Sequence, residues 1–275
     1  MLVNRQNSIK KMKKTLLFAI ISIFLGSCSP FQKALKSEDS AVKYAEAEKL
    51  YNKGKLNKAI QLFEQLQSSY KGKPQAEKMF YMYSQSLYKT KQYYAAGYQF
   101  EKFASSYPKS EKLEEAAYLG AFCYSKLSPV YSLDQTDTEK AIEKMQNFID
   151  TYPESKNLSE ANIVVKTLRE KIEKKSFENA REYNKISDYK SALVALDNFI
   201  ADFPGTPFKE AALYYKLDSA YKLAINSIPS KMEERLNNSK VFYNNLIKFN
   251  PNTTYKSEAD EMLVQIEKNL QQFSK

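Results

Sequence analysis

Residues 75–108, QAEKMFYMYSQSLYKTKQYYAAGYQFEKFASSYP, contain two apolar helical patterns separated by a polar break and followed by Tyr-Pro. The flanking sequence repeats this arrangement, because Tyr44 and Phe63 precede Tyr81 and Phe100 by 37 residues. A fixed period of this length is typical of stacked helical hairpins, which cannot bury their apolar faces alone. The stretch therefore predicts an array of paired helices.

The composition of the whole chain agrees with an all-α fold. Its 275 residues include 6 Gly and 9 Pro, and apolar and polar residues show no sustained alternation of the kind found in strands. The closing proline recurs as Pro108, Pro153, Pro204 and Pro251, at intervals of 45, 51 and 47 residues. These intervals exceed the basic period of about 34 residues. The later hairpins should therefore carry insertions.

Three segments account for the extra length. We expect loops over Ser128–Asp137 and Ser227–Lys231, each of which contains a proline, and a long helix over Ser159–Lys185. The predicted organisation is a signal peptide over 1–27, a tether over 28–36 and an array over 37–275, with hairpins at 37–73, 74–109, 110–154, 155–205 and 206–252 and a capping helix at 257–273.

The first 27 residues have the three-part form of a secretory signal. Basic residues are followed by an apolar run over Leu16–Leu25, which is too short to span a bilayer because a spanning helix needs about 20 apolar residues. The run ends in Leu-Gly-Ser-Cys at residues 25–28, which resembles a bacterial lipobox. That resemblance implies that Cys28 is acylated and becomes the mature N-terminus. The alternative is a cleaved signal beside an incidental cysteine, and Met12 is a second plausible start.

Acylation of Cys28 would anchor the chain to a membrane surface, because two or more fatty chains give stable anchoring. Position 29 is Ser rather than Asp. By resemblance to proteobacterial lipoprotein sorting, this favours the outer membrane over retention in the inner membrane. No acidic cluster directly follows Cys28, so we expect a lipid-anchored protein that faces the periplasm.

Charge and chemistry argue against nucleic-acid binding and catalysis. Removal of the five basic residues before Cys28 lowers the formal charge from +10 to +5, which is a weak basis for binding phosphate backbones. The chain has no histidine, and its second cysteine, Cys123, lies between aromatic residues like a small buried hydrophobe. The glycines are scattered rather than gathered in a phosphate-binding loop. We expect no enzyme activity, no cofactor and no metal.

Small and apolar residues recur at matching positions of the hairpins. Small residues recur at Ala47, Ser84, Ala121 and Ala180, and alanines recur at Ala59, Ala96, Ala141 and Ala192 with a large apolar residue four positions later. These positions resemble the tetratricopeptide repeat. That resemblance implies a tetratricopeptide-repeat superhelix, an α-solenoid of about five helical hairpins with a C-terminal capping helix. The repeat alone indicates only a fold, because such arrays serve many partners.

Together with the lipobox, the repeats resemble the BamD family, the lipoprotein subunit of the outer-membrane β-barrel assembly machinery. The Bacteroidetes form is most similar, on Cys-Ser-Pro-Phe-Gln-Lys at residues 28–33 and Leu-Asp-Gln at residues 133–135. The resemblance implies a non-catalytic scaffold in the assembly complex. Its N-terminal repeats would receive unfolded β-barrel proteins, and its C-terminal repeats would dock the periplasmic domains of the barrel-forming insertase.

The first helix of each hairpin lines the concave groove of a tetratricopeptide array, so the resemblance also indicates candidate binding residues. Tyrosines seven residues apart share a helix face, and their large rings with polar tips suit an extended peptide. The alternative is that these rings only pack between helices. The candidates are Tyr44, Glu48, Tyr51, Asn52, Tyr81, Gln85, Tyr88, Lys89, Tyr118 and Phe122.

The sequence is also compatible with two other functions. One is a glycan-binding lipoprotein that serves nutrient uptake through tetratricopeptide helices, against which the absence of Trp argues. The other is an envelope adaptor for division or peptidoglycan machinery.

Overall fold

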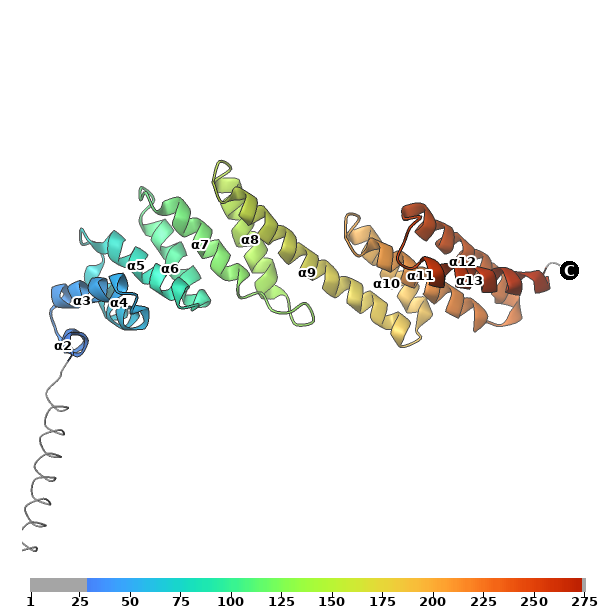
Figure 1. Ribbon diagram of the computed structural model, residues 1–275, viewed down its shortest axis with the longest axis horizontal. Helices are drawn as coiled ribbons and strands as arrows, with labels where there is room; N and C mark the ends of the chain where they lie inside the picture. Colours follow the sequence, from blue (N-terminus) through green and yellow to red (C-terminus); the bar gives the residue numbers. More distant parts are fainter. Residues whose placement is uncertain (1–28, 274–275) are drawn as a thin grey trace, which may run out of the picture. The chain divides into compact units, whose positions relative to one another are not determined.

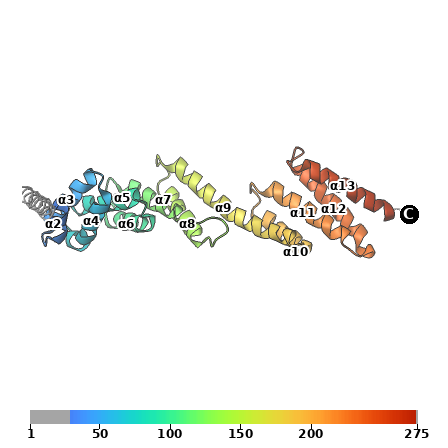
Figure 2. The same ribbon diagram turned by 60° about the horizontal axis from the view of Figure 1, so that its bottom comes forward.

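The computed structural model describes residues 29–273, which form an all-α fold of the tetratricopeptide-repeat, α-solenoid class (Figure 1 and Figure 2). No strand occurs within this range. The expected signal peptide and Cys28 lie outside the described residues. The helices are α2 (Pro30–Lys36), α3 (Ser40–Asn52), α4 (Leu56–Tyr70), α5 (Ala76–Lys89), α6 (Tyr93–Ser106), α7 (Leu113–Ser125), α8 (Thr136–Thr151), α9 (Leu158–Lys185), α10 (Tyr189–Asp202), α11 (Lys209–Ile225), α12 (Pro229–Phe249) and α13 (Lys256–Leu270), followed by the 3₁₀ turn η1 (Gln271–Phe273).

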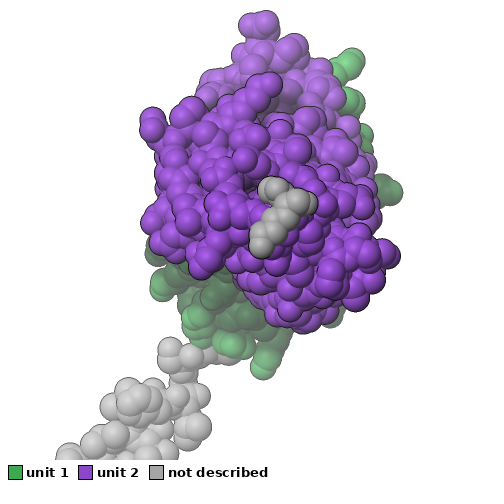
Figure 3. All heavy atoms as spheres, turned by 90° about the vertical axis from the view of Figure 1, so that its right-hand side faces the viewer, with its two compact units in different colours: residues 1–123 green, residues 124–275 purple. Residues whose placement is uncertain are grey.

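The chain divides into two compact units, residues 1–123 and 124–275 (Figure 3). Within each unit, helices that follow one another in the sequence pack against one another, as α3 does on α4 and α11 does on α12. In the first unit α3 also contacts α5, the first helix of the next hairpin. Contacts restricted to near neighbours are the defining property of repeat arrays.

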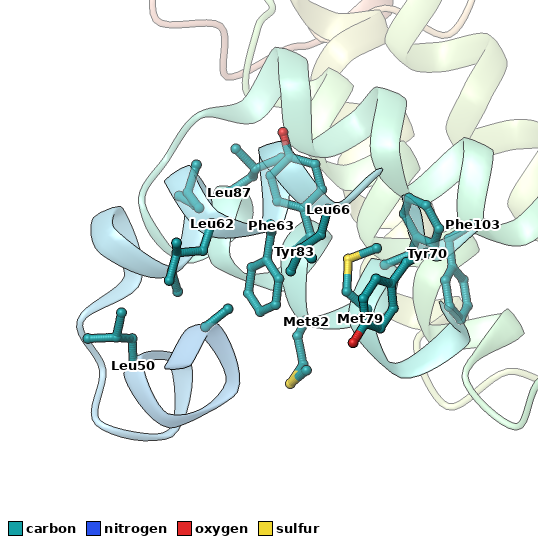
Figure 4. Packing of buried hydrophobic residues seen from close by; sticks show 14 of the residues in the cluster. Leu50, Leu62, Phe63, Leu66, Tyr70, Met79, Met82, Tyr83, Leu87 and Phe103 are labelled. Carbon is teal, nitrogen blue, oxygen red and sulfur yellow. The ribbon is translucent and has the colours of Figure 1, made fainter. Parts of the chain in front are cut away.

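The core of the first unit is formed mainly by α4 and α5. Leu62, Phe63 and Leu66 recur on one side of α4 at helical spacing and are fully buried. They face α5, where the Tyr83 ring lies 6.2 Å from the Phe63 ring, centroid to centroid (Figure 4). The repeated small residues allow this close packing, since Ala59 is also fully buried.

The core of the second unit follows the same plan. Phe177 of α9 packs against Phe199 of α10, with 5.6 Å between the ring centroids. Leu217, Leu236 and Ile266 are fully buried where α11, α12 and α13 meet. The predicted capping helix is therefore present as α13, and its apolar side closes this end of the core.

The turns inside the hairpins share one backbone geometry. Gly54, between α3 and α4, has a positive φ of 68°, and Lys91 and Ser187 occupy the equivalent places with φ values of 61° and 65°. In each case the next residue donates its backbone N–H to the carbonyl five residues back, as in Gln92 to Leu87 at 2.9 Å. This is the arrangement that ends many helices, and glycine suits it because the left-handed conformation crowds a Cβ atom.

We therefore expect Lys91→Gly to stabilise the fold by up to about 1 kcal/mol, because the turn would lose left-handed strain at no cost in contacts. Urea unfolding followed by circular dichroism measures the difference. Lys53→Gly is the matched control, since Lys53 caps α3 with a φ of −85° and gains nothing from glycine. Equal or lower stability of Lys91→Gly than of Lys53→Gly would contradict this account.

The connections between hairpins also share one backbone geometry. Tyr107, Tyr152 and Phe203 end their helices with φ values of −128°, −126° and −127°. Each is followed by proline and, two residues later, by Ser or Thr. The hydroxyl of that residue accepts a backbone N–H at the start of the next hairpin, as Ser110 does from Lys112 at 3.0 Å. The recurring Tyr/Phe-Pro is thus the joint between hairpins.

Residues 30–36 are a helix rather than the tether expected over 28–36. Pro30 occupies the first helical turn, and the Ser29 hydroxyl accepts the N–H of Gln32 at 3.3 Å. Phe31 and Ala34 are buried against α3 and α4, with exposed fractions of 7% and 2%. The burial of Phe31 depends on packing against α3 and α4, which follow it in the chain, so the local sequence does not reveal it.

The inserted segments agree with expectation in part. The long helix is confirmed as α9, which begins one residue before Ser159. The loop expected over 128–137 ends at Gln135, because α8 begins at Thr136. The loop expected over 227–231 is wrong from Pro229 onward: this proline starts α12, where its missing N–H costs nothing.

Candidate binding face of α3, α5 and α7

All ten candidate residues lie in the first unit, on the first helices of successive hairpins. Tyr44, Glu48, Tyr51 and Asn52 belong to α3, the next four to α5, and Tyr118 and Phe122 to α7. Nine of them take part in the side-chain contacts described below, whereas Asn52 is the exposed last residue of α3. We refer to these nine as the aromatic face: Tyr44, Glu48, Tyr51, Tyr81, Gln85, Tyr88, Lys89, Tyr118 and Phe122.

Two contacts join α3 to α5 across this face. Lys78 of α5 places its Nζ 2.5 Å from an oxygen of Glu48, and this hydrogen bond raises the pKa of Lys78. At the other end of α5, the Nζ of its last residue, Lys89, lies 5.4 Å from the centroid of the Tyr51 ring. A cation in this position is attracted to the ring face. An ion pair and a cation–π contact therefore join the two helices.

Tyr44 extends the face toward α4. Its ring stacks on that of Tyr70, with 5.1 Å between centroids and 21° between planes. Burial, and then the neighbouring Glu48 carboxylate, raise the pKa of the Tyr44 hydroxyl. The ring therefore keeps its proton at neutral pH and remains a hydrogen-bond donor.

Tyr81 is the best-anchored ring of the face. Its hydroxyl accepts a hydrogen bond from the Gln85 amide at 2.9 Å. Burial raises its pKa well above the ordinary value, and a hydrogen bond to Glu115 of α7 adds to the shift. On its other side the ring lies 5.6 Å from Phe103, centroid to centroid. Its polar end thus joins α5 to α7, and its apolar end joins the core.

The same face continues along α7 as a group of rings. Phe122 lies 6.4 Å from Tyr88 and 5.8 Å from Tyr118, centroid to centroid. Both distances fall in the range of favourable aromatic pairs. The rings of α5 and α7 are thus packed against one another.

The exposed fractions of these side chains fit both alternatives, packing between helices and binding of a ligand. Most rings of the face are partly buried, Gln85 and Tyr118 are buried at 7% exposure each, and Lys89 is exposed. The rings pack between helices and also keep part of their surface in solvent. Such rings are held rigidly, so a ligand that binds them orders few new side chains.

A pocket of about 440 Å³ in the first unit was not predicted from the sequence. It lies at the carboxyl ends of α4 and α6, and its aromatic walls are mutually packed: Tyr107 is 5.2 Å from Phe103 and 6.4 Å from Phe80, centroid to centroid. The recurring Phe-x-x-x-Tyr-Pro ending was the available signal. The lining residues are Gln67, Lys71, Gly72, Phe80, Lys102, Phe103, Ser106 and Tyr107.

The described residues offer contact surface more than reactive groups. Burial raises the pKa of the Cys123 thiol to about 12, which removes the thiolate needed of a nucleophile. Between residues 29 and 273, no group of three or more His, Cys, Asp or Glu could hold a metal ion. No helix in that range is both long enough and apolar enough to cross a membrane.

Comparison with known proteins adds two sequence matches. The family model described as "YfiO: Outer membrane lipoprotein" matches residues 36–189 and 172–273. The outer membrane protein assembly factor BamD of Caulobacter vibrioides is 21% identical over 193 residues, which cover 70% of this chain. The match spans 62% of that relative's length.

Similar solved structures also contain tetratricopeptide repeats. One is the TPR2AB domain of yeast Sti1, solved in an HSP90 complex, with a TM-score of 0.37, 16% identity and coverage of 83% of this chain and 98% of that one. Another holds nearly identical TPR-like repeats of a Podospora anserina kinesin light chain, with a TM-score of 0.31, 14% identity and coverage of 78% and 95%.

Proposed function

The chain belongs to the YfiO family of outer membrane lipoproteins, and we propose on this premise that it is a non-catalytic scaffold for the assembly of outer-membrane β-barrel proteins. The name of its relative in Caulobacter vibrioides, an outer membrane protein assembly factor, supports the same role. The observation that carries the proposal is the aromatic face, a surface of pre-packed tyrosines on three successive first helices.

The aromatic face suits an unfolded barrel strand for physical reasons. Such a strand alternates apolar and polar side chains. The phenol rings offer apolar area to the first kind and hydroxyl groups to the second, with little rotamer entropy to lose. Lys89, which is exposed, adds an ammonium group that can donate hydrogen bonds to backbone carbonyls. An aggregation-prone segment would be held in extended form until it is inserted.

The remaining parts of the chain complete the proposed role. Acylation of Cys28 would anchor the protein in the outer membrane with its helices in the periplasm. The second unit would dock the tandem periplasmic domains of a barrel-forming insertase. Unfolded barrel proteins, that insertase and the membrane would then be its three partners.

Depletion of the protein in its own organism tests this function. We expect the level of heat-modifiable, folded outer-membrane barrels to fall severalfold before growth stops, while periplasmic proteins stay constant. Re-expression of the unchanged chain should restore the barrels. Normal levels of folded barrels after depletion would refute the proposal.

A further inference from the structure

Basic side chains gather where the described chain begins. A shallow pocket of about 170 Å³ lies there, and four of its nine lining residues are lysines. Across residues 29–58 there are seven lysines and four acidic residues. The pocket is lined by Ser29, Pro30, Phe31, Glu46, Lys49, Leu50, Lys53, Lys55 and Lys58.

The acidic side chains in this region are largely engaged by partners. Glu46, the acid that lines the pocket, pairs with Lys49 at 3.2 Å. Glu48 pairs with Lys78 on α5, and Asp39 accepts the N–H that starts α3. The surface charge that remains is therefore basic.

The lysines stand on a fixed backbone. Gly54 turns the chain with its positive φ and leaves Lys53 and Lys55 exposed on either side of it. The Nζ of Lys58 lies 5.2 Å from the centroid of the Phe31 ring, which ties α4 to α2. We call Lys53, Lys55 and Lys58, which line the pocket and are exposed, the basic rim.

We propose that the basic rim binds the anionic phospholipid headgroups of the leaflet that holds the N-terminal lipid. The inference rests on the proposed acylation of Cys28. Ser29 lines the pocket and follows Cys28 directly in the sequence. Because α2 is packed into the core, no slack chain separates the anchor from the rim. The lysines must then lie at headgroup level.

Lysine suits this position because its ammonium is a compact charge on a flexible stem. Each lysine close to an anionic membrane surface strengthens binding by about fivefold at moderate salt. The attraction falls off within about 10 Å at 0.1 M salt, so only side chains near the anchor take part. The consequence is an oriented protein: the lipid holds it at the membrane, and the rim fixes which end of the first unit faces the bilayer.

The test uses the acylated full chain reconstituted into vesicles, with a fluorophore on Asn57→Cys beside the rim. Asn57 is exposed, whereas Cys123 is buried and unreactive, so the label is specific. Lipids that carry a headgroup quencher report how close the label is to the bilayer. We expect at least twofold more quenching in vesicles with 30% phosphatidylglycerol than in pure phosphatidylcholine, and loss of the difference at high salt.

Charge reversal at Lys53→Glu with Lys55→Glu should reduce the quenching to the phosphatidylcholine level. Lys156→Glu with Lys231→Glu makes the same charge change at exposed sites in the second unit and should leave quenching unchanged. Equal quenching of the acylated protein in both vesicle types would refute headgroup binding by the basic rim but would not contradict the proposed scaffold function. A mass spectrum that shows unmodified Cys28 overturns the rim together with the anchor.

Discussion

Export of the chain without Cys28 is expected to move nearly all of the protein from the membrane fraction to the soluble periplasmic fraction. The change replaces residues 1–28 with a secretory signal that lacks a lipobox and is cleaved before Ser29. On the proposal that Cys28 is acylated, its acyl chains would supply the stable attachment. We expect less than about a tenth of this form to sediment with membranes at high salt, which suppresses the contribution of the basic rim.

The matched control carries the signal and cysteine of another lipoprotein, joined at the same residue. It should sediment with the outer membrane as the unchanged chain does. Sedimentation of the cysteine-free form with membranes at high salt would contradict the proposal that acyl chains on Cys28 hold the protein at the membrane.

Truncation of two rings of the aromatic face should give the largest loss of binding. For Tyr51→Ala with Tyr88→Ala, we expect the affinity for a peptide that matches the last strand of an outer-membrane barrel to fall by about tenfold to a hundredfold. Tyrosines at the centre of an interface commonly contribute on this scale. Fluorescence anisotropy with a labelled peptide measures the dissociation constants.

Tyr94→Ala with Tyr98→Ala is the control for this experiment. It removes two phenol rings from α6 that are 73% and 56% exposed, and it should leave the affinity unchanged. Since Tyr88 also packs on Phe100, circular dichroism must show that the binding variant remains folded. Lys89→Glu serves as a second variant, because its exposed side chain can change without cost to the core. Unaltered affinity in both variants would mean that the strand binds elsewhere.

The fold could be predicted from the sequence because small and large residues recur in it at a fixed period. Ala59 and Ala96 are fully buried, and so are Phe63 and Phe100, four positions after each of them. Each feature depends on contacts within one hairpin or with the next one. Local patterns therefore carry most of the information.

The errors share a physical cause, which is dependence on distant packing. The sequence around Pro30 and Pro229 permits either a loop or the first turn of a helix. For Pro30, the burial of Phe31 against α3 and α4 decides the outcome. The repeat pattern places the aromatic face on first helices, but it does not show which side chains meet. Lys78 and Glu48, which form an ion pair, are 30 residues apart in the sequence. The pocket beside Tyr107 is lined by residues from separate helices.

Site-specific photocrosslinking in living cells tests most directly whether the aromatic face holds unfolded barrel proteins. A photoreactive phenylalanine derivative replaces Lys89, which is exposed on the face, or Tyr94, which is exposed on α6. We predict that position 89 crosslinks to precursors of outer-membrane barrels, identified by mass spectrometry, and that position 94 does not. Barrel precursors captured equally at both positions, or at neither, would contradict the account.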